Sequence, residues 1–185
     1  MTYRWNYSTL SSDQKNVTNE LAKEIDLHPV LVELLVNKGI ESVGEANKYL
    51  YPKLEDLHDP FLLPDMDKAI RRIEKALGNK ERILIYGDYD VDGTTAVSLV
   101  YKFFRGITNN IDYYIPDRYD EGYGISFQGI DYAVKTGVKL IISLDCGIKA
   151  VSKVAYARER GIDFIICDHH MPDTCLPEAV AVVDA

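Results

Sequence analysis

The sequence predicts an α/β protein in which a parallel β-sheet flanked by helices follows a small helical N-terminal segment. Short apolar runs bounded by Gly and Asp, at residues 83–86, 140–144 and 164–167, are typical of strands that are buried on both faces. Segments with apolar residues at helical spacing separate these runs. Strands and helices in alternation indicate a parallel sheet with right-handed crossover connections.

The first fifty residues are expected to be mostly helical. The periodicity predicts helices at about 13–25, 30–39 and 42–50. Asp13 can cap the first of them, and Gly39 ends the second. Prolines at positions 52, 60 and 64 then indicate an irregular connection.

The rest of the chain begins with a basic helix at 66–77 and then alternates. The basic side chains are more typical of a solvated face than of a track for DNA: Lys68, Arg71, Arg72 and Lys75. Strands are expected at 82–86, 111–115, 139–144, 163–167 and 180–183, and helices at about 93–105, 126–136 and 148–160. We expect a helical prelude with its connection at 1–64 and the α/β domain at 65–185. Because the last strand runs straight into the terminus, we expect the chain to be a piece of a longer protein.

Composition limits the classes of function and the cellular locations that fit this chain. The 185 residues carry a net charge of −8, which argues against this piece alone gripping a nucleic-acid backbone. No apolar run approaches the roughly 20 residues that span a bilayer. Residues 1–6 lack the pattern of a secretory signal, and the three cysteines have no CxxC spacing, so we expect reduced thiols and a cytoplasmic location. Two of these cysteines, Cys146 and Cys167, are expected to be small buried residues rather than ligands.

Three clusters of acids and histidines each follow an apolar run. They are Asp88, Asp90 and Asp92 before Gly93, then Asp145, then Asp168-His169-His170. The functional edge of a parallel sheet lies at the carboxyl ends of its strands, so the clusters should converge there. So much negative charge calls for divalent cations, and carboxylates with imidazole suit Mn²⁺ or Mg²⁺.

Each cluster also has a simpler interpretation. The first could be a solvated capping turn, although three acids exceed what a cap needs. If residues 88–92 are extended, their alternate carboxylates point the same way. An EF-hand loop is excluded because its Glu would fall at Leu99. Asp145 alone could be a turn residue, and the histidines a surface pair.

Together the clusters resemble, in order and context, the DHH phosphoesterase superfamily, which is named for the Asp-His-His found here at 168–170. Within it, the chain is similar to the RecJ family of single-strand-specific DNA exonucleases. Three further stretches carry this resemblance: residues 27–40 (LHPVLVELLVNKGI), 59–66 (DPFLLPDM) and 114–125 (YIPDRYDEGYGI). One departure is minor, since the family commonly has Asn where Asp117 stands.

The resemblance implies a metal-dependent exonuclease that degrades single-stranded DNA from the 5′ end, releases 5′-mononucleotides and acts in DNA repair and recombination. It implies a site for two Mn²⁺ or Mg²⁺ ions held by Asp90, Asp92, Asp145 and His169, with Asp88 as a ligand or a partner behind the ligands. Asp168 would orient His169 or bond the backbone. His170 would act as a general acid or contact the scissile phosphate.

The loop after the second strand is expected to bind substrate. Gly122 and Gly124 allow close approach of a ligand to the backbone. Arg118 can pair with a phosphate, and Tyr119 or Tyr123 can stack on a base. A tight turn with ordinary surface residues is the simpler interpretation.

The family also uses a later Asp ligand and later domains to hold the strand, so we expect weak metal binding and little activity from residues 1–185 alone. Single-stranded DNA is the expected partner, with a single-strand-binding protein or a helicase as further candidates. Three alternatives stay open. They are a DHH phosphodiesterase that acts on short RNA or cyclic dinucleotides, a manganese pyrophosphatase, and a non-catalytic replication scaffold. The prelude, the Asp-rich first motif and the intact acids argue against them in turn.

Overall fold

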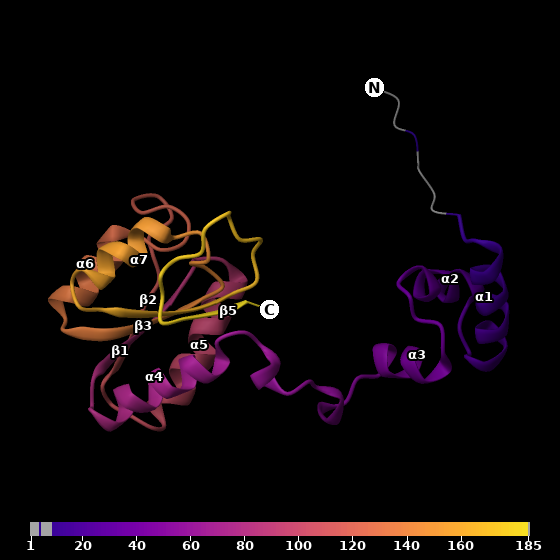
Figure 1. Ribbon diagram of the computed structural model, residues 1–185, viewed down its shortest axis with the longest axis horizontal. Coiled ribbons are helices and arrows are strands. Elements are labelled where there is room, and N and C mark those ends of the chain that lie inside the picture. The colour runs from indigo at the N-terminus through magenta and orange to yellow at the C-terminus, as the bar shows by residue number, and fades with distance from the viewer. Residues whose placement is uncertain (1–3, 5–8, 185) are drawn as a thin grey trace. The chain divides into compact units, whose positions relative to one another are not determined.

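The computed structural model describes Arg4 and residues 9–184, so most of residues 1–6, where the absence of a secretory signal was inferred, lies outside the described residues. The chain divides into two compact units, Met1–His58 and Asp59–Ala185 (Figure 1). No helix in the described part of the chain combines the length and the apolar character that crossing a bilayer requires.

The first unit consists of three short helices. They are α1 (Ser12–Glu24), α2 (Pro29–Asn37) and α3 (Val43–Leu50). Its small core includes Leu21 of α1 and Val32 and Val36 of α2. The cap of α1 differs from the prediction, because the N-cap is Ser11 and not Asp13. The hydroxyl of Ser11 accepts the backbone amide of Gln14, and the side-chain oxygen of Gln14 accepts the backbone amide of Ser11. Such a capping box satisfies two helix-end amides at once, which Asp13 inside the first turn could not do.

The second unit is a five-stranded, all-parallel sheet with helices on both faces, as the sequence predicts. The strand order is β2-β1-β3-β4-β5. The strands are β1 (Arg82–Gly87), β2 (Ile111–Tyr114), β3 (Val138–Leu144), β4 (Asp163–Asp168) and β5 (Ala181–Asp184), and the helices are α4 (Met66–Gly78), α5 (Val91–Arg105), α6 (Phe127–Lys135) and α7 (Val151–Arg158). The connection expected to be irregular contains two short 3-10 helices, Leu54–Asp56 and Pro60–Leu62.

Two apolar cores sandwich the sheet (Figure 1). Helices α4 and α5 cover one face through residues such as Ala76 and Val97, and α6 and α7 cover the other through Ile130 and Val154. The strand order reverses between β1 and β3, because β2 lies beyond β1 on one side while β4 and β5 extend the sheet on the other. Such a switch point is where open α/β sheets bind ligands.

The sequence predicts that the basic face of α4 is solvated, but one of its residues, Arg72, is buried. Arg72 is 8% exposed, and its guanidinium donates to Asp163 (2.6 Å) and Glu81 (2.7 Å). Burial requires such pairing, and the partners lie at or just before the amino ends of β4 and β1. Asp65, before α4, accepts the backbone amide of Val182 in β5 (3.2 Å) and pairs with Lys68.

Candidate metal centre

The first acidic cluster is held where β1 passes directly into α5. A Cβ on Gly93 would lie 2.6 Å from the Asp88 carbonyl oxygen, and one on Gly87 would lie 2.3 Å from Val97. Both glycines therefore let the helix begin against the end of the strand. Asp88 is fully buried, whereas Asp90 is the N-cap of α5 and accepts the Gly93 amide (2.9 Å).

The expectation of an extended stretch through these acids is wrong. The chain bends after Asp88, and helix α5 starts at Val91. Asp92 consequently lies in the first turn of the helix and is exposed. The N-cap geometry of Asp90, rather than strand alternation, sets the directions of the carboxylates.

Asp88 carries an unusual buried carboxylate. One oxygen accepts the Tyr89 amide (2.7 Å), and the other has no hydrogen-bond partner in the described part of the chain. Burial raises the pKa of Asp88, and the charges of Asp90 and Asp145 add to the effect. The amides of Tyr89 and Gly124 oppose it, although the Gly124 amide lacks hydrogen-bond geometry. A buried oxygen without a donor, beside two further acids, fits a nearby cation.

Asp145 follows β3 in a strained backbone conformation. Its φ is +60°, in the left-handed region that residues other than Gly rarely adopt. Its amide donates to the carbonyl of Cys167 (2.9 Å), which ties the end of β3 to β4. Strain of this kind clusters at functional sites, where the surrounding structure imposes it.

Asp168 organises the last cluster. One of its oxygens accepts the amides of His169 (2.8 Å) and His170 (3.2 Å) and lies 2.7 Å from Nδ1 of His170, and the other accepts the Ile148 amide (3.0 Å). Desolvation acts to raise the pKa of Asp168, but these hydrogen bonds outweigh it and lower the pKa. The bond to Asp168 in turn raises the pKa of His170. Of the two roles that the resemblance implies for Asp168, the structure shows the bonding of backbone amides at the turn, and the imidazole that Asp168 orients is that of His170 rather than His169.

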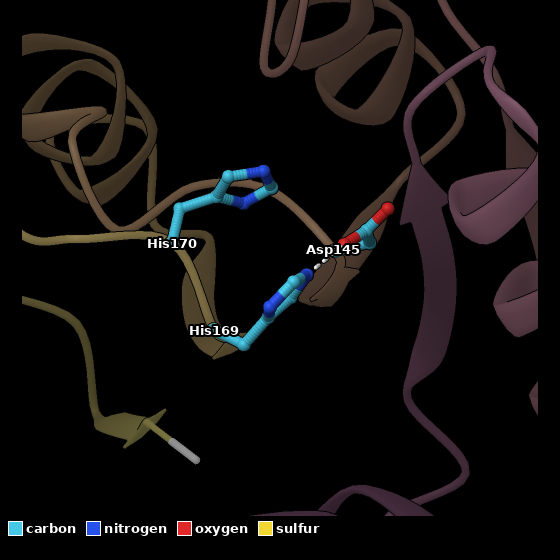
Figure 2. Close-up of side chains that lie close together, drawn as sticks. All are labelled: Asp145, His169 and His170. Atoms are coloured by element: carbon cyan, nitrogen blue, oxygen red, sulfur yellow. Dashed lines mark hydrogen bonds and ion pairs between the residues drawn. The ribbon is translucent and has the colours of Figure 1, made fainter. Parts of the chain in front are cut away.

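Figure 2 shows the group that these elements bring together, with both imidazoles extending toward Asp145. One ligand atom from each of Asp145, His169 and His170 lies within 4.8 Å of the others, and His169 Nε2 is 3.0 Å from Asp145 Oδ1. Among the described residues this is the only such group, so Asp90 and Asp92 stand outside it. One carboxylate with two imidazoles can hold a divalent metal ion.

The loop between β2 and α6 reaches the same edge. The hydroxyl of Tyr123 lies 3.3 Å from His170 Nε2, and burial together with the charges of Asp88 and Asp145 raises the pKa of Tyr123 to about 12. The Arg118 guanidinium lies over the ring of Tyr89, 5.3 Å from its centroid, and that ring packs edge-on against Tyr123. Gly122 and Gly124 have φ values of +80° and +77°.

Sequence reasoning missed the residues that fix this loop. Glu121 accepts the hydroxyl of Tyr114 (2.9 Å), the amide of Asp117 (2.8 Å) and the hydroxyl of Ser126. The buried hydroxyl of Tyr86 donates to the Gly124 carbonyl (3.1 Å) and accepts the Ser126 amide (3.0 Å). The available signal was a tyrosine in an otherwise aliphatic strand, since its hydroxyl needs a partner when buried.

Residues 82–185 match the DHH family, N-terminal domain. The single-stranded-DNA-specific exonuclease RecJ of Bacillus subtilis (strain 168) is 37% identical over 97% of this chain, which corresponds to 22% of that protein. A crystal structure of exonuclease RecJ bound to manganese covers 69% of this chain and 33% of its own, with a TM-score of 0.63 and 27% identity. The structure of RecJ in complex with Mn²⁺ from Thermus thermophilus covers 92% of this chain and 23% of its own, with a TM-score of 0.70; at 21% identity it shows the shared fold.

The chain spans about a quarter of the length of the curated relatives that it matches. The resemblance to RecJ is confirmed over most of the chain. The family match includes β1 to β5 and all three acidic clusters. The chain belongs to the DHH family.

Proposed function

We propose that the chain is the metal-binding part of an exonuclease that degrades single-stranded DNA from the 5′ end, releases 5′-mononucleotides and acts in DNA repair and recombination. The observation that carries the proposal is the meeting of Asp145, His169 and His170 beside the unpartnered, buried carboxylate oxygen of Asp88. The names of the relatives supply the substrate, and manganese is present in two solved RecJ structures.

In this proposal Asp90, Asp92, Asp145 and His169 hold two Mn²⁺ or Mg²⁺ ions, with Asp88 as a ligand or directly behind the ligands. Bound divalent cations supply a water of lowered pKa and neutralise charge on the phosphate oxygens. One oxygen of Asp90 accepts the Gly93 amide, and the other has no hydrogen-bond partner among the residues that the structure describes.

His170 acts as the general acid of the reaction or contacts the scissile phosphate. Its Nδ1 is paired with Asp168, which leaves Nε2 to donate to the leaving oxygen or to bind the scissile phosphate. Tyr123 contacts that nitrogen and keeps its own proton because of its raised pKa. Arg118 pairs with a phosphate, and Tyr123 stacks on a base between the backbones of Gly122 and Gly124.

Single-stranded DNA is the proposed substrate, delivered by a single-strand-binding protein or a helicase. With a net charge of −8, residues 1–185 hold the strand weakly by themselves. We therefore expect little nuclease activity from this chain alone, and binding of the metal is the direct test.

Titration with Mn²⁺ by calorimetry tests the proposal. We expect binding by the original chain and a loss of at least about tenfold in affinity for Asp90→Ala, Asp145→Ala and His169→Ala. Asp120→Ala is the matched control, because Asp120 is exposed and its side chain makes no hydrogen bond in the described part of the chain. Equal affinity of all four variants and the original would refute the proposal.

A further inference from the structure

A cavity of about 200 Å³ opens beside the candidate metal centre, and the proposed function assigns it no occupant. It shares Asp168 and His170 with the centre, and Tyr123 forms a third part of its wall. An occupant would therefore lie against the imidazole proposed to face the scissile phosphate. Its volume is below the roughly 300–1,000 Å³ of sites for drug-sized ligands, so it suits one unit of a polymer.

One side of the cavity is apolar. Ile125, Cys146 and Ile148 line it and are each at most 3% exposed. This wall offers a rigid surface for a sugar or a base rather than for another charge.

Another part of the lining is cationic. Lys149, just before α7, and Lys153, in its first turn, both line the cavity. In the described part of the chain, the nearest carboxylate to pair with Lys149 is that of Asp173 at 4.0 Å, and Lys153 is half-buried and forms no ion pair. Ala150, the N-cap of α7, also lines the cavity and supplies no side-chain acceptor for the first amides of the helix. Two ammonium groups and open helix amides attract an anion.

We infer that this cavity holds one nucleotide unit of the substrate, with a phosphate group at Lys149 and Lys153 and its sugar and base along the apolar wall. The inference rests on the proposed function, because it places that unit next to the phosphate at His170. It assigns the two lysines a role in binding and not in the chemical step. In a chain of net charge −8, they offset the repulsion between the acidic edge and the DNA backbone.

The test follows amide resonances of the isotope-labelled chain by NMR with Mg²⁺ present, using thymidine 5′-monophosphate, thymidine and inorganic phosphate as probes. We expect the monophosphate to shift residues 146–153 and Ile125 and to bind more tightly than either fragment. Lys149→Gln/Lys153→Gln should weaken that binding about tenfold, since each exposed charge contact contributes modestly. The matched control is Lys135→Gln/Lys139→Gln, whose lysines are exposed and lie at the other edge of the sheet.

Three outcomes would overturn the inference: monophosphate shifts confined to His169 and Asp145, affinity unchanged in the double variant, or a fragment that binds as tightly as the monophosphate. Shifts caused by Mg²⁺ alone at Asp145 and His169 report the metal centre separately. If the shifts caused by Mg²⁺ are present but the resonances of the residues that line the cavity do not shift with the monophosphate, the inference fails and the proposed function stands. If Mg²⁺ causes no shift there, the proposed function fails first.

Discussion

At the scale of single residues, Asp145 combines a chemical role with a backbone cost. A residue with a Cβ in the left-handed region loses roughly 1–2 kcal/mol relative to an ordinary conformation. The carbonyl of Cys167 and the tight packing around Gly147, whose added Cβ would lie 2.9 Å from Ile125, hold the loop there. The carboxylate thus reaches His169 at the expense of folding stability.

Replacing Asp145 separates the two effects. Asp145→Gly removes the strain and Asp145→Ala keeps it, so we expect the Gly variant to be more stable than the Ala variant by about 1 kcal/mol in urea unfolding. Both variants should lose Mn²⁺ affinity in calorimetry. Asp92 is the matched position, because it is helical: there Gly should be less stable than Ala by about 1 kcal/mol. The same order of stability at both positions would contradict the strain at Asp145.

The meeting of Asp145 with His169 and His170 could be predicted, because these residues directly follow two apolar runs that form neighbouring strands. The left-handed conformation of Asp145 and the pairing of Asp168 with His170 could not be predicted from the sequence. Both depend on hydrogen bonds from segments at least twenty residues away, such as the amide of Ile148 and the carbonyl of Cys167.

At the scale of elements, the loop between β2 and α6 is an ordered part of the site. The carboxylate of Glu121 accepts bonds from the end of β2, from the loop and from the N-cap of α6, and it is only partly exposed. Its bonds fix both ends of the segment that carries Arg118 and Tyr123. A rigid loop loses less conformational entropy than a flexible one when it binds a DNA strand.

Glu121→Gln should loosen this loop. The amide replaces one acceptor oxygen with a donor, so at least one of three bonds is lost, at a cost of about 1–3 kcal/mol. We expect faster amide hydrogen exchange across residues 117–126 and little change in β3 and β4. Asp120→Asn, in the same loop, is the control and should exchange like the original. Uniformly faster exchange in the Glu121 variant would mean that the carboxylate supports the whole fold.

The order and type of the elements followed from periodicity, and the fold class is confirmed. Two local details did not follow. The bend after Asp88 depends on Gly93 meeting the Asp88 backbone, and the choice of Ser11 over Asp13 as a cap depends on the answering side chain of Gln14. Ser11 and Asp13 lie two positions apart and are both residue types that favour helix N-caps, so the sequence alone distinguishes them poorly.

At the scale of the whole second unit, Arg72 ties α4 to the sheet. Its guanidinium bonds both Glu81, next to β1, and Asp163, which lies 91 positions after Arg72 in the chain. Helical periodicity places Arg72 on a basic face but carries no information about an acid so distant in sequence. The prediction of a solvated face is therefore wrong for Arg72, whereas Lys68, Arg71 and Lys75 are exposed as expected.

Glu81 should make this stabilisation depend on pH. Burial acts to raise the pKa of Glu81, but bonds from Asn79 and Arg72 outweigh it and lower the pKa. The ion pair therefore stabilises the fold above the ordinary carboxyl pKa of about 4.3 and stops doing so as pH falls through the lower folded value. In denaturant unfolding, Glu81→Gln should be less stable than the original at neutral pH, and the difference should shrink as the pH falls below the ordinary carboxyl value. Glu74→Gln, on the exposed side of α4, is the matched control.

The bond from Val182 to Asp65 bears on self-association at high concentration. A strand at the end of a sheet offers unpaired amides to any neighbouring molecule, and proteins often block such edges with charge. In β5 one amide is already engaged by a carboxylate, and Lys68 sets a positive charge beside it. An incoming strand would have to displace an ion pair before it could add to the sheet. Asp65 and Lys68 thus make the addition of a strand at β5 less favourable.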